Sequence, residues 1–409
     1  MAKPKLALIP ATQGSKLYSV LPADGVGDFT FSRNSAATRI NKDGLIETVA
    51  VGKSRLNYPL IDGVVNGCPS HLLEPSRLQL IQYSEDFSDA SWTKGGTSVT
   101  SGFVSPDGTL NADKITPTGI NEAHQIYQNK TITSNQSYTI SAFMKFGGYR
   151  YLECRETFGG KGIGFDTTTQ TFYGINTPTS FKGVILKNGW VRMEATYTSI
   201  GTSAFFLLYS TPILMNPTFL GDGTSGFYTW GAQLEQGSYA TSYIPTTSSA
   251  VTRVAETANG AGDASTFNDS EGVLMAEISA LANIGSFENI SLSNGSSASR
   301  VFLFYRNSLN LMEFRVTVNN SIQMVFQHTI ADAKTSNKFA IKYKENDFAI
   351  WINGIEVHTD PNGITFGSFP LTNLSLDNGQ VSSPTDPFKG KTKQLQYFDS
   401  ALNDSDLET

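Results

Sequence analysis

Short runs of alternating apolar and polar residues fill this chain, and they constrain its fold more than any other feature. Almost no window repeats apolar residues at the three- and four-residue spacing of an amphipathic helix. The runs are rich in β-branched and aromatic residues, and glycine, asparagine, aspartate, serine and threonine separate them, as they do between short strands. The pattern predicts an all-β chain that forms two antiparallel β-sandwiches. Clear examples are 137–146, 204–209, 300–305 and 348–352.

The size and charge of the chain exclude several classes of protein. A length of 409 residues suits two or three domains at roughly 150 residues each. Aromatic residues make up 11% of the chain, which is too many for a disordered protein. The formal charge is −6 and no basic run is present. We therefore expect no nucleic-acid partner, because phosphate binding needs clustered lysine and arginine.

Membrane insertion, export and disulfides are not expected either. No run reaches the roughly 18 apolar residues of a membrane-spanning helix. The apolar run near the N-terminus ends at Pro10 after four residues, whereas a signal peptide needs about 7–15. We therefore expect synthesis in a bacterial cytoplasm without export by that route. Cys68 and Cys154 are far apart in the sequence and are expected to be unpaired thiols.

The first zone, residues 1–78, contains few strong strand patterns. One hairpin is predicted, from 38–40 to 45–49, because Asp43-Gly44 supplies the positive φ angles of a tight turn. The rest reads as extended chain that needs another surface to lie on. We interpret the zone as a docking arm that orders on assembly and buries Phe29, Phe31 and Leu45 against neighbouring proteins.

Two further zones have enough strands for a core each. Residues 79–250 suit one jelly-roll sandwich, and 251–270 read as a linker. Residues 271–409 form the second sandwich, with a hairpin that turns at Asn353-Gly354. The tryptophans embedded in strand-like runs are expected in the cores. They are Trp190, Trp230 and Trp351.

Patterns for catalysis and metal binding are missing from the sequence. The four histidines are scattered without metal-ligand spacing, and no nucleophile motif is present. We therefore expect no enzyme, no cofactor and no assigned metal site, with a structural calcium ion in the second zone left open. Glu153 and Glu156 would lie on opposite faces of a strand, which does not suit glycoside hydrolysis. Carboxylates from different strands stay open, so a polysaccharide depolymerase is an alternative.

One strand-like segment carries residue types that recognise sugars. Tyr149, Tyr151 and Glu153 are spaced by two, so they would share the outer face of a strand. Leu152 and Cys154 would then face the core. Tyrosine rings beside a carboxylate can stack on a sugar and hydrogen-bond its hydroxyl groups, so we predict a saccharide platform here. An ordinary sheet surface or a subunit contact is the alternative. Three loop residues are expected to join the platform, namely Trp92, Phe158 and Tyr173.

Several of these stretches resemble known families. The first zone resembles a segment of tail and fibre proteins of bacterial viruses, in Phe29–Glu47, Arg55–Gly63, Gly67–Pro69 and Leu72–Arg77. The second zone is similar to jelly rolls of carbohydrate-binding modules, in Tyr83–Trp92, Gly231–Glu235 and Tyr243–Pro245. The third resembles concanavalin A-like sandwiches of the laminin-G type, in Ala349–Gly354, Leu395–Leu402 and Asp404–Glu408.

The resemblance implies a non-enzymatic structural protein of a tailed bacteriophage, such as a tail, fibre or baseplate appendage. It implies a virion location, contacts with other virion proteins through residues 1–78, and attachment to host-surface polysaccharide. Repetition of weak sugar sites on a symmetric particle would raise avidity, so we expect a homo-oligomer, with a trimer favoured. A head or tail decoration protein without any ligand is the alternative. The chain shows no heptad stalk and no β-helix repeat, which favours a compact appendage.

Overall fold

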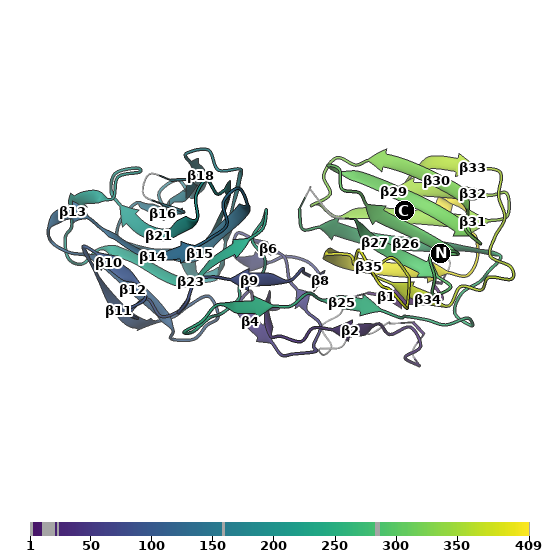
Figure 1. Ribbon diagram of the computed structural model, residues 1–409, viewed down its shortest axis with the longest axis horizontal. Helices are drawn as coiled ribbons and strands as arrows, with labels where there is room; N and C mark the ends of the chain where they lie inside the picture. The colour runs from purple at the N-terminus through teal and green to yellow at the C-terminus, as the bar shows by residue number, and fades with distance from the viewer. Residues whose placement is uncertain (1–2, 10–20, 23, 158–159, 283–286, 409) are drawn as a thin grey trace.

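The computed structural model describes residues 3–9, 21–22, 24–157, 160–282 and 287–408. These residues form two β-sandwiches that lie side by side, with short strands between them (Figure 1). The prediction of an all-β fold with two antiparallel sandwiches is confirmed. Helical structure within the described residues is limited to η1 (Lys187–Gly189) and α1 (Asp404–Leu407). None of the helices described is long and apolar enough to cross a membrane.

The first sandwich, the jelly roll, packs a six-stranded sheet against an eight-stranded one. The six-stranded sheet has the order β10 (Thr93–Gly95), β14 (Gln125–Thr131), β21 (Ser203–Thr211), β16 (Tyr151–Arg155), β17 (Gly162–Asp166), β18 (Thr171–Ile175). Six strands of the eight-stranded sheet have the order β11 (Thr97–Phe103), β12 (Ala112–Pro117), β23 (Gly226–Gln236), β15 (Ser137–Gly147), β20 (Trp190–Thr198), β19 (Ser180–Ile185). The other two strands lie off this path: β9 (Arg77–Gln79) pairs with β23, and β24 (Val251–Arg253) pairs with β9.

The alternation of side chains along each strand decides what this core contains. Leu152 and Cys154 of β16 point inward, as predicted, and both are fully buried. On β20, Met193 and Ala195 enter the same core, whereas Arg192 and Glu194 lie on the opposite face. A smaller apolar cluster on the outer side of the eight-stranded sheet contains two of the predicted core tryptophans, Trp190 and Trp230.

The second sandwich packs an eight-stranded sheet against a five-stranded one. The first sheet has the order β33 (Ile355–Asp360), β32 (Phe348–Ile352), β31 (Asn337–Lys344), β26 (Glu271–Ala280), β35 (Gly390–Phe398), β8 (Ser70–Leu73), β5 (Leu56–Asn57), with β1 (Leu6–Leu8) also on β35. The second has the order β30 (Ser321–Thr329), β29 (Leu311–Val318), β28 (Arg300–Tyr305), β27 (Glu288–Ser293), β34 (Asn373–Ser375). Trp351 is buried, as predicted.

Both predicted hairpins are present. Strands β3 (Ala37–Ile40) and β4 (Ile46–Val49) pair around Gly44, whose φ is 79°. Strands β32 and β33 pair around Asn353 and Gly354, with φ angles of 52° and 79°. Positive φ at these positions is the requirement from which the two turns were predicted. Three further two-stranded pairs complete the strands described, namely β2 (Thr30–Ser32) with β25 (Thr257–Asn259), β6 (Leu60–Ile61) with β7 (Val64–Val65), and β13 (Asn121–Ala123) with β22 (Thr218–Leu220).

The first zone differs from the predicted arm, because its described strands complete both sandwiches. Strands β1, β5 and β8 extend a sheet of the second sandwich, and β9 pairs with β23 of the jelly roll. Residues of the predicted linker join in, since β24 pairs with β9 and β25 with β2. The backbone hydrogen bonds that an extended segment needs are therefore made within the chain. Figure 1 shows β2, β8, β9 and β25 lying between the two sandwiches.

The residues predicted to dock on neighbouring proteins are mostly engaged inside this chain. Phe29 is 2% exposed and belongs to the core of the second sandwich, and Phe31 packs against the same core. Leu45 is half-buried in the turn of the first hairpin. Phe29 is thus corrected from a docking residue to a core residue, because its ring has an apolar site in its own chain.

Candidate functional site

The predicted saccharide platform forms only in part. Tyr151, Glu153 and Tyr173 meet on the outer face of the six-stranded sheet, where the two tyrosine rings lie 6.4 Å apart edge to face. The ring of Tyr173 crosses the strand at Gly164, where an added Cβ would lie 2.1 Å from a ring carbon. Its hydroxyl group then donates to Glu153 Oε1 at 3.1 Å. Absence of a side chain at residue 164 thus lets Tyr173 reach Glu153.

Glu153 is fully buried, and its oxygens are already occupied. Nε and Nη2 of Arg155 and the hydroxyl group of Tyr209 donate to Oε2 at 2.5–2.9 Å. The backbone N–H of Met215 donates to Oε1 at 2.9 Å, so the loop after β21 covers the carboxylate. Such a carboxylate is the centre of a structural hydrogen-bond network, because its acceptor positions are satisfied within the protein.

Trp92 and Tyr149 of the predicted platform lie elsewhere, and Phe158 is outside the described residues. Trp92 is 1% exposed, its ring centroid lies 4.5 Å from that of Phe87 with the two rings tilted by 33°, and its indole N–H donates to a backbone carbonyl at 3.0 Å. It is a core residue, because its large apolar surface finds a site between the two sheets. Tyr149 is 9% exposed, packs edge-on against Phe219 and accepts a hydrogen bond from the backbone N–H of Asp222. Neither ring offers a face to a ligand.

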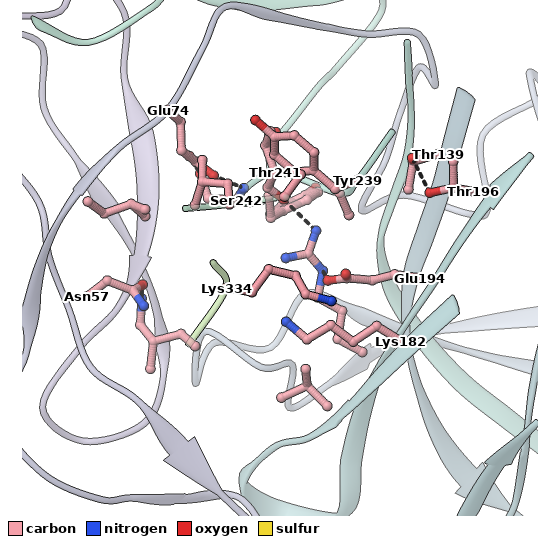
Figure 2. A pocket seen from close by; sticks show the side chains of 18 of the residues that line it. Asn57, Glu74, Thr139, Lys182, Glu194, Thr196, Tyr239, Thr241, Ser242 and Lys334 are labelled. Atoms are coloured by element: carbon pink, nitrogen blue, oxygen red, sulfur yellow. Dashed lines mark hydrogen bonds and ion pairs between the residues drawn. The ribbon is translucent and has the colours of Figure 1, made fainter. Parts of the chain in front are cut away.

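A cavity of about 700 Å³ lies where the two sandwiches and the first zone meet (Figure 2). Its floor is the outer face of the jelly-roll strands β15, β19 and β20, and the hairpin β3–β4 forms one wall. The end of β26, Lys334 and Lys391 bring the second sandwich to the same cavity. The volume falls within the roughly 300–1,000 Å³ of small-molecule sites.

Aromatic and hydrogen-bonding side chains line this cavity together. Tyr239 is half-buried and Phe181 is exposed in it. The guanidinium of Arg192 is held above the Phe143 ring at 5.4 Å, and its Nη2 donates to the carbonyl of Thr241 at 2.6 Å. The remaining polar side chains of the lining include Asn57, Thr139, Ser180, Thr196, Ser238 and Ser242. A ring beside several neutral donors and acceptors is the composition that a sugar requires.

Positive charge dominates the lining. Among the described residues, five cationic side chains face two carboxylates. Glu194 pairs with Nε of Arg192 at 3.3 Å, and Glu74 pairs with Arg55 and Arg253, each at 2.8 Å. Among the described residues, three of these cations form no ion pair with a carboxylate, namely Lys182, Lys334 and Lys391.

Glu74, one of the two carboxylates of the cavity, is held ionised. Burial alone would raise the pKa of Glu74, but the guanidiniums of Arg253 and Arg55 hold that pKa well below its usual range. Glycoside hydrolysis needs one carboxylic acid that keeps its proton near neutral pH beside a second, ionised carboxylate. Glu74 cannot supply that proton. Across the described residues, histidine, cysteine, aspartate and glutamate side chains form no cluster of three or more arranged for a metal ion.

None of the cavity residues was identified from the sequence. They come from the first hairpin, three jelly-roll strands, the segment 238–243 and the second sandwich. Lys182 stands opposite Glu194 in the register of β19 and β20, which is the one local sign of a polar face. The other cavity residues come together because the first zone pairs with both sandwiches. No spacing in the sequence indicates that pairing.

The chain was compared with known proteins and structures. No family model matches it, and no curated protein matches it. A solved structure of the CBM40 of Ruminococcus gnavus IT-sialidase bound to α2,3-sialyllactose aligns with 37% of this chain and 91% of its own, at 16% identity and a TM-score of 0.31. The CBM22 tandem of Paenibacillus barcinonensis Xyn10C aligns with 81% and 100% of the two chains, at 12% identity and a TM-score of 0.25. Domains LG4-5 of the mouse laminin α1 chain align with 79% of this chain and 94% of their own, at 9% identity and a TM-score of 0.23.

Proposed function

We propose that this chain is a non-enzymatic saccharide-binding protein and that its binding site is the cavity between the sandwiches. The observation that carries the proposal is the composition of that cavity, in which Tyr239 and Phe181 stand among hydroxyl, amide and charged side chains. Sugars present C–H surfaces that pack on aromatic rings and hydroxyl groups that need planar polar partners. The outer face at Tyr151 and Tyr173 offers less, because Glu153 is already saturated.

The charged residues of the cavity favour binding without cleavage. Glu74 is kept ionised, and Glu194 is paired with Arg192. Glu74 lies among arginine guanidiniums and not in the apolar environment that would hold its proton, which is how a general acid for glycosidic bonds is made. Incubation of a bound polysaccharide with the protein should therefore leave its chain length unchanged, whereas shortened chains would support the depolymerase alternative.

Tyr239→Ala tests the binding site. We expect loss of one stacking ring to weaken saccharide binding at least about tenfold, or about 1.4 kcal/mol. Binding should be measured by isothermal titration with the best ligand from an array of bacterial surface glycans. Tyr151→Ala is the matched control, since it removes a half-buried tyrosine from the other sheet and should leave affinity unchanged. A loss with Tyr151→Ala and none with Tyr239→Ala would move the site to the outer face, and no binding to any glycan would refute the proposal.

We further propose that the protein is carried on the particle of a tailed bacteriophage, as a compact appendage that attaches to host polysaccharide. The resemblance of Phe29–Glu47 to tail and fibre proteins supports this location. Repeated copies, with a trimer favoured, would add the avidity that a single weak site lacks. Antibodies against the chain should label one fixed position on purified phage particles in electron micrographs. Particles that carry no label while the chain is present in the lysate would contradict the virion location.

A further inference from the structure

Three lysines from separate parts of the fold reach the same cavity. Lys182 lies on β19 of the jelly roll, Lys334 in the turn before β31, and Lys391 on β35 of the second sandwich. Figure 2 shows the side chains of Lys182 and Lys334 extending into the cavity toward one another. All three are exposed, so their ammonium groups are open to a ligand that enters the cavity.

The carboxylates nearby do not neutralise these lysines. Glu194 lies within 3.3 Å of Arg192, and Glu74 lies between Arg55, Arg253 and the Ser242 hydroxyl. Arg39, the fifth cation of the lining, pairs with Glu47 at 3.1 Å. Each carboxylate is thus matched by an arginine, and the positive charge in excess is that of the lysines. The chain as a whole is acidic, at −6, so this cavity is a local exception.

Two of the lysines, Lys182 and Lys391, also repel each other. The protein atoms around the cavity partly desolvate the ammonium group of Lys391 and lower its pKa, and the charge of Lys182 lowers it further, while Glu74 and Glu194 act in the opposite direction. Like charges held close together destabilise a folded protein, and an anion between them removes that cost. Lysines without such an anion would be an unfavourable feature of a purely structural surface.

We propose that the saccharide bound in this cavity is acidic and presents carboxylates, of the uronic-acid kind, to Lys182, Lys334 and Lys391. This inference rests on the proposed saccharide site and names its ligand class. The three lysines stand on two sandwiches, so they match charges spaced along an oligosaccharide better than one compact ion. Tyr239 and the neutral side chains between them supply the contacts for uncharged parts of the sugar rings.

The ligand class is tested with pairs of oligosaccharides that differ only in charge. Oligogalacturonate, oligomannuronate and hyaluronan oligosaccharides, each beside its carboxyl-reduced form, should be titrated into the whole protein. We expect at least one acidic member to bind about tenfold or more tightly than its reduced form. The difference should shrink as sodium chloride is raised from 50 to 500 mM, because salt screens the lysines. Equal binding of both forms, or of neutral glycans alone, would overturn the acidic class and leave the saccharide site intact. Binding of no saccharide would overturn both.

Lysine variants distinguish a ligand site from a merely structural role. Lys182→Gln, Lys334→Gln and Lys391→Gln should each weaken binding of the acidic oligosaccharide several-fold. They should leave the melting temperature of the unliganded protein unchanged or raise it, because repulsion is relieved. Lys338→Gln, an exposed lysine of β31 outside the cavity, is the matched control and should change neither quantity. Unchanged affinity in all three cavity variants would contradict the proposal. Sodium sulfate that displaces the sugar at equal concentration would show a site for any anion and contradict the saccharide class.

Discussion

Glu256→Gln should lower the free energy of unfolding by about 3–5 kcal/mol, because it removes one charge from a buried ion network. Glu256 is fully buried, and its Oε1 accepts hydrogen bonds from Arg33 Nη1 at 2.7 Å and Arg55 Nε at 2.8 Å. Its Oε2 accepts from Arg55 Nη2 and from the backbone N–H of Glu74. Three arginines, Arg33, Arg55 and Arg253, share the charges of Glu74 and Glu256.

The network has no spare negative charge to replace Glu256. His71 lies beside it with neither ring nitrogen hydrogen-bonded, and burial lowers its pKa to about 4, so at neutral pH it is uncharged. In Glu256→Gln the guanidiniums would face Glu74 alone. The network joins the first zone to residues between the two sandwiches. Its loss should therefore loosen the first zone and those residues together. Its anionic members have lowered pKa values, and the stability they add is present near neutral pH and lost in strong acid.

Urea unfolding of wild type and Glu256→Gln measures this effect. Glu271→Gln is the control, because its partner Lys344 is 3.6 Å away and half exposed. An exposed pair of this kind contributes only about 0–1 kcal/mol. A Glu256→Gln protein within 1 kcal/mol of wild type, by the same measurement, would show that the buried network does not hold the two sandwiches together.

Glu288→Gln should stabilise the protein by about 2–4 kcal/mol at pH 7.5 and change little at pH 4.5. Glu288 is largely buried at the start of β27, and its Oε2 has no hydrogen-bond partner. Burial raises its pKa from 4.5 to about 8, although Lys389 acts in the opposite direction. The folded protein therefore holds a proton that the unfolded chain releases. The contribution of this group is fully present below pH 4.5 and is lost as the pH rises toward 8.

Thermal unfolding from pH 4.5 to 7.5 tests the Glu288 prediction. Burial also lowers the pKa of Lys389, to about 8, so that residue stays mostly charged across this range. We expect the difference between Glu288→Gln and wild type to grow steadily with pH. Glu345→Gln, an exposed substitution, should follow wild type at every pH. A constant difference between the two proteins would mean that Glu288 is not protonated in the fold.

The sandwich architecture could be predicted because each strand carries its own pattern. Leu152 and Cys154 alternate with outward residues, and both enter the core. The pair Asn353-Gly354 predicted a hairpin turn, and the structure confirms it. These features depend on neighbours one or two positions apart in the sequence. The buried state of Trp190, Trp230 and Trp351 followed from the same runs.

The role of the first zone could not be predicted, because short strands such as β5 and β8 join a sheet through backbone hydrogen bonds. Those bonds leave no pattern in side chains. The same pairing places Asn57 and Glu74 beside the jelly roll and so creates the cavity. The position of Glu153 on the outer face of its strand was predicted correctly. No sequence pattern indicated that a loop covers its carboxylate.

A crystal structure of the protein with a bound carboxylated oligosaccharide would show whether the cavity holds an acidic sugar. We expect sugar density in the cavity, packed against Tyr239, with carboxylates within hydrogen-bond distance of lysines from both sandwiches. Sugar bound at Tyr151 and Tyr173, or held by a single sandwich away from the cavity, would contradict this expectation.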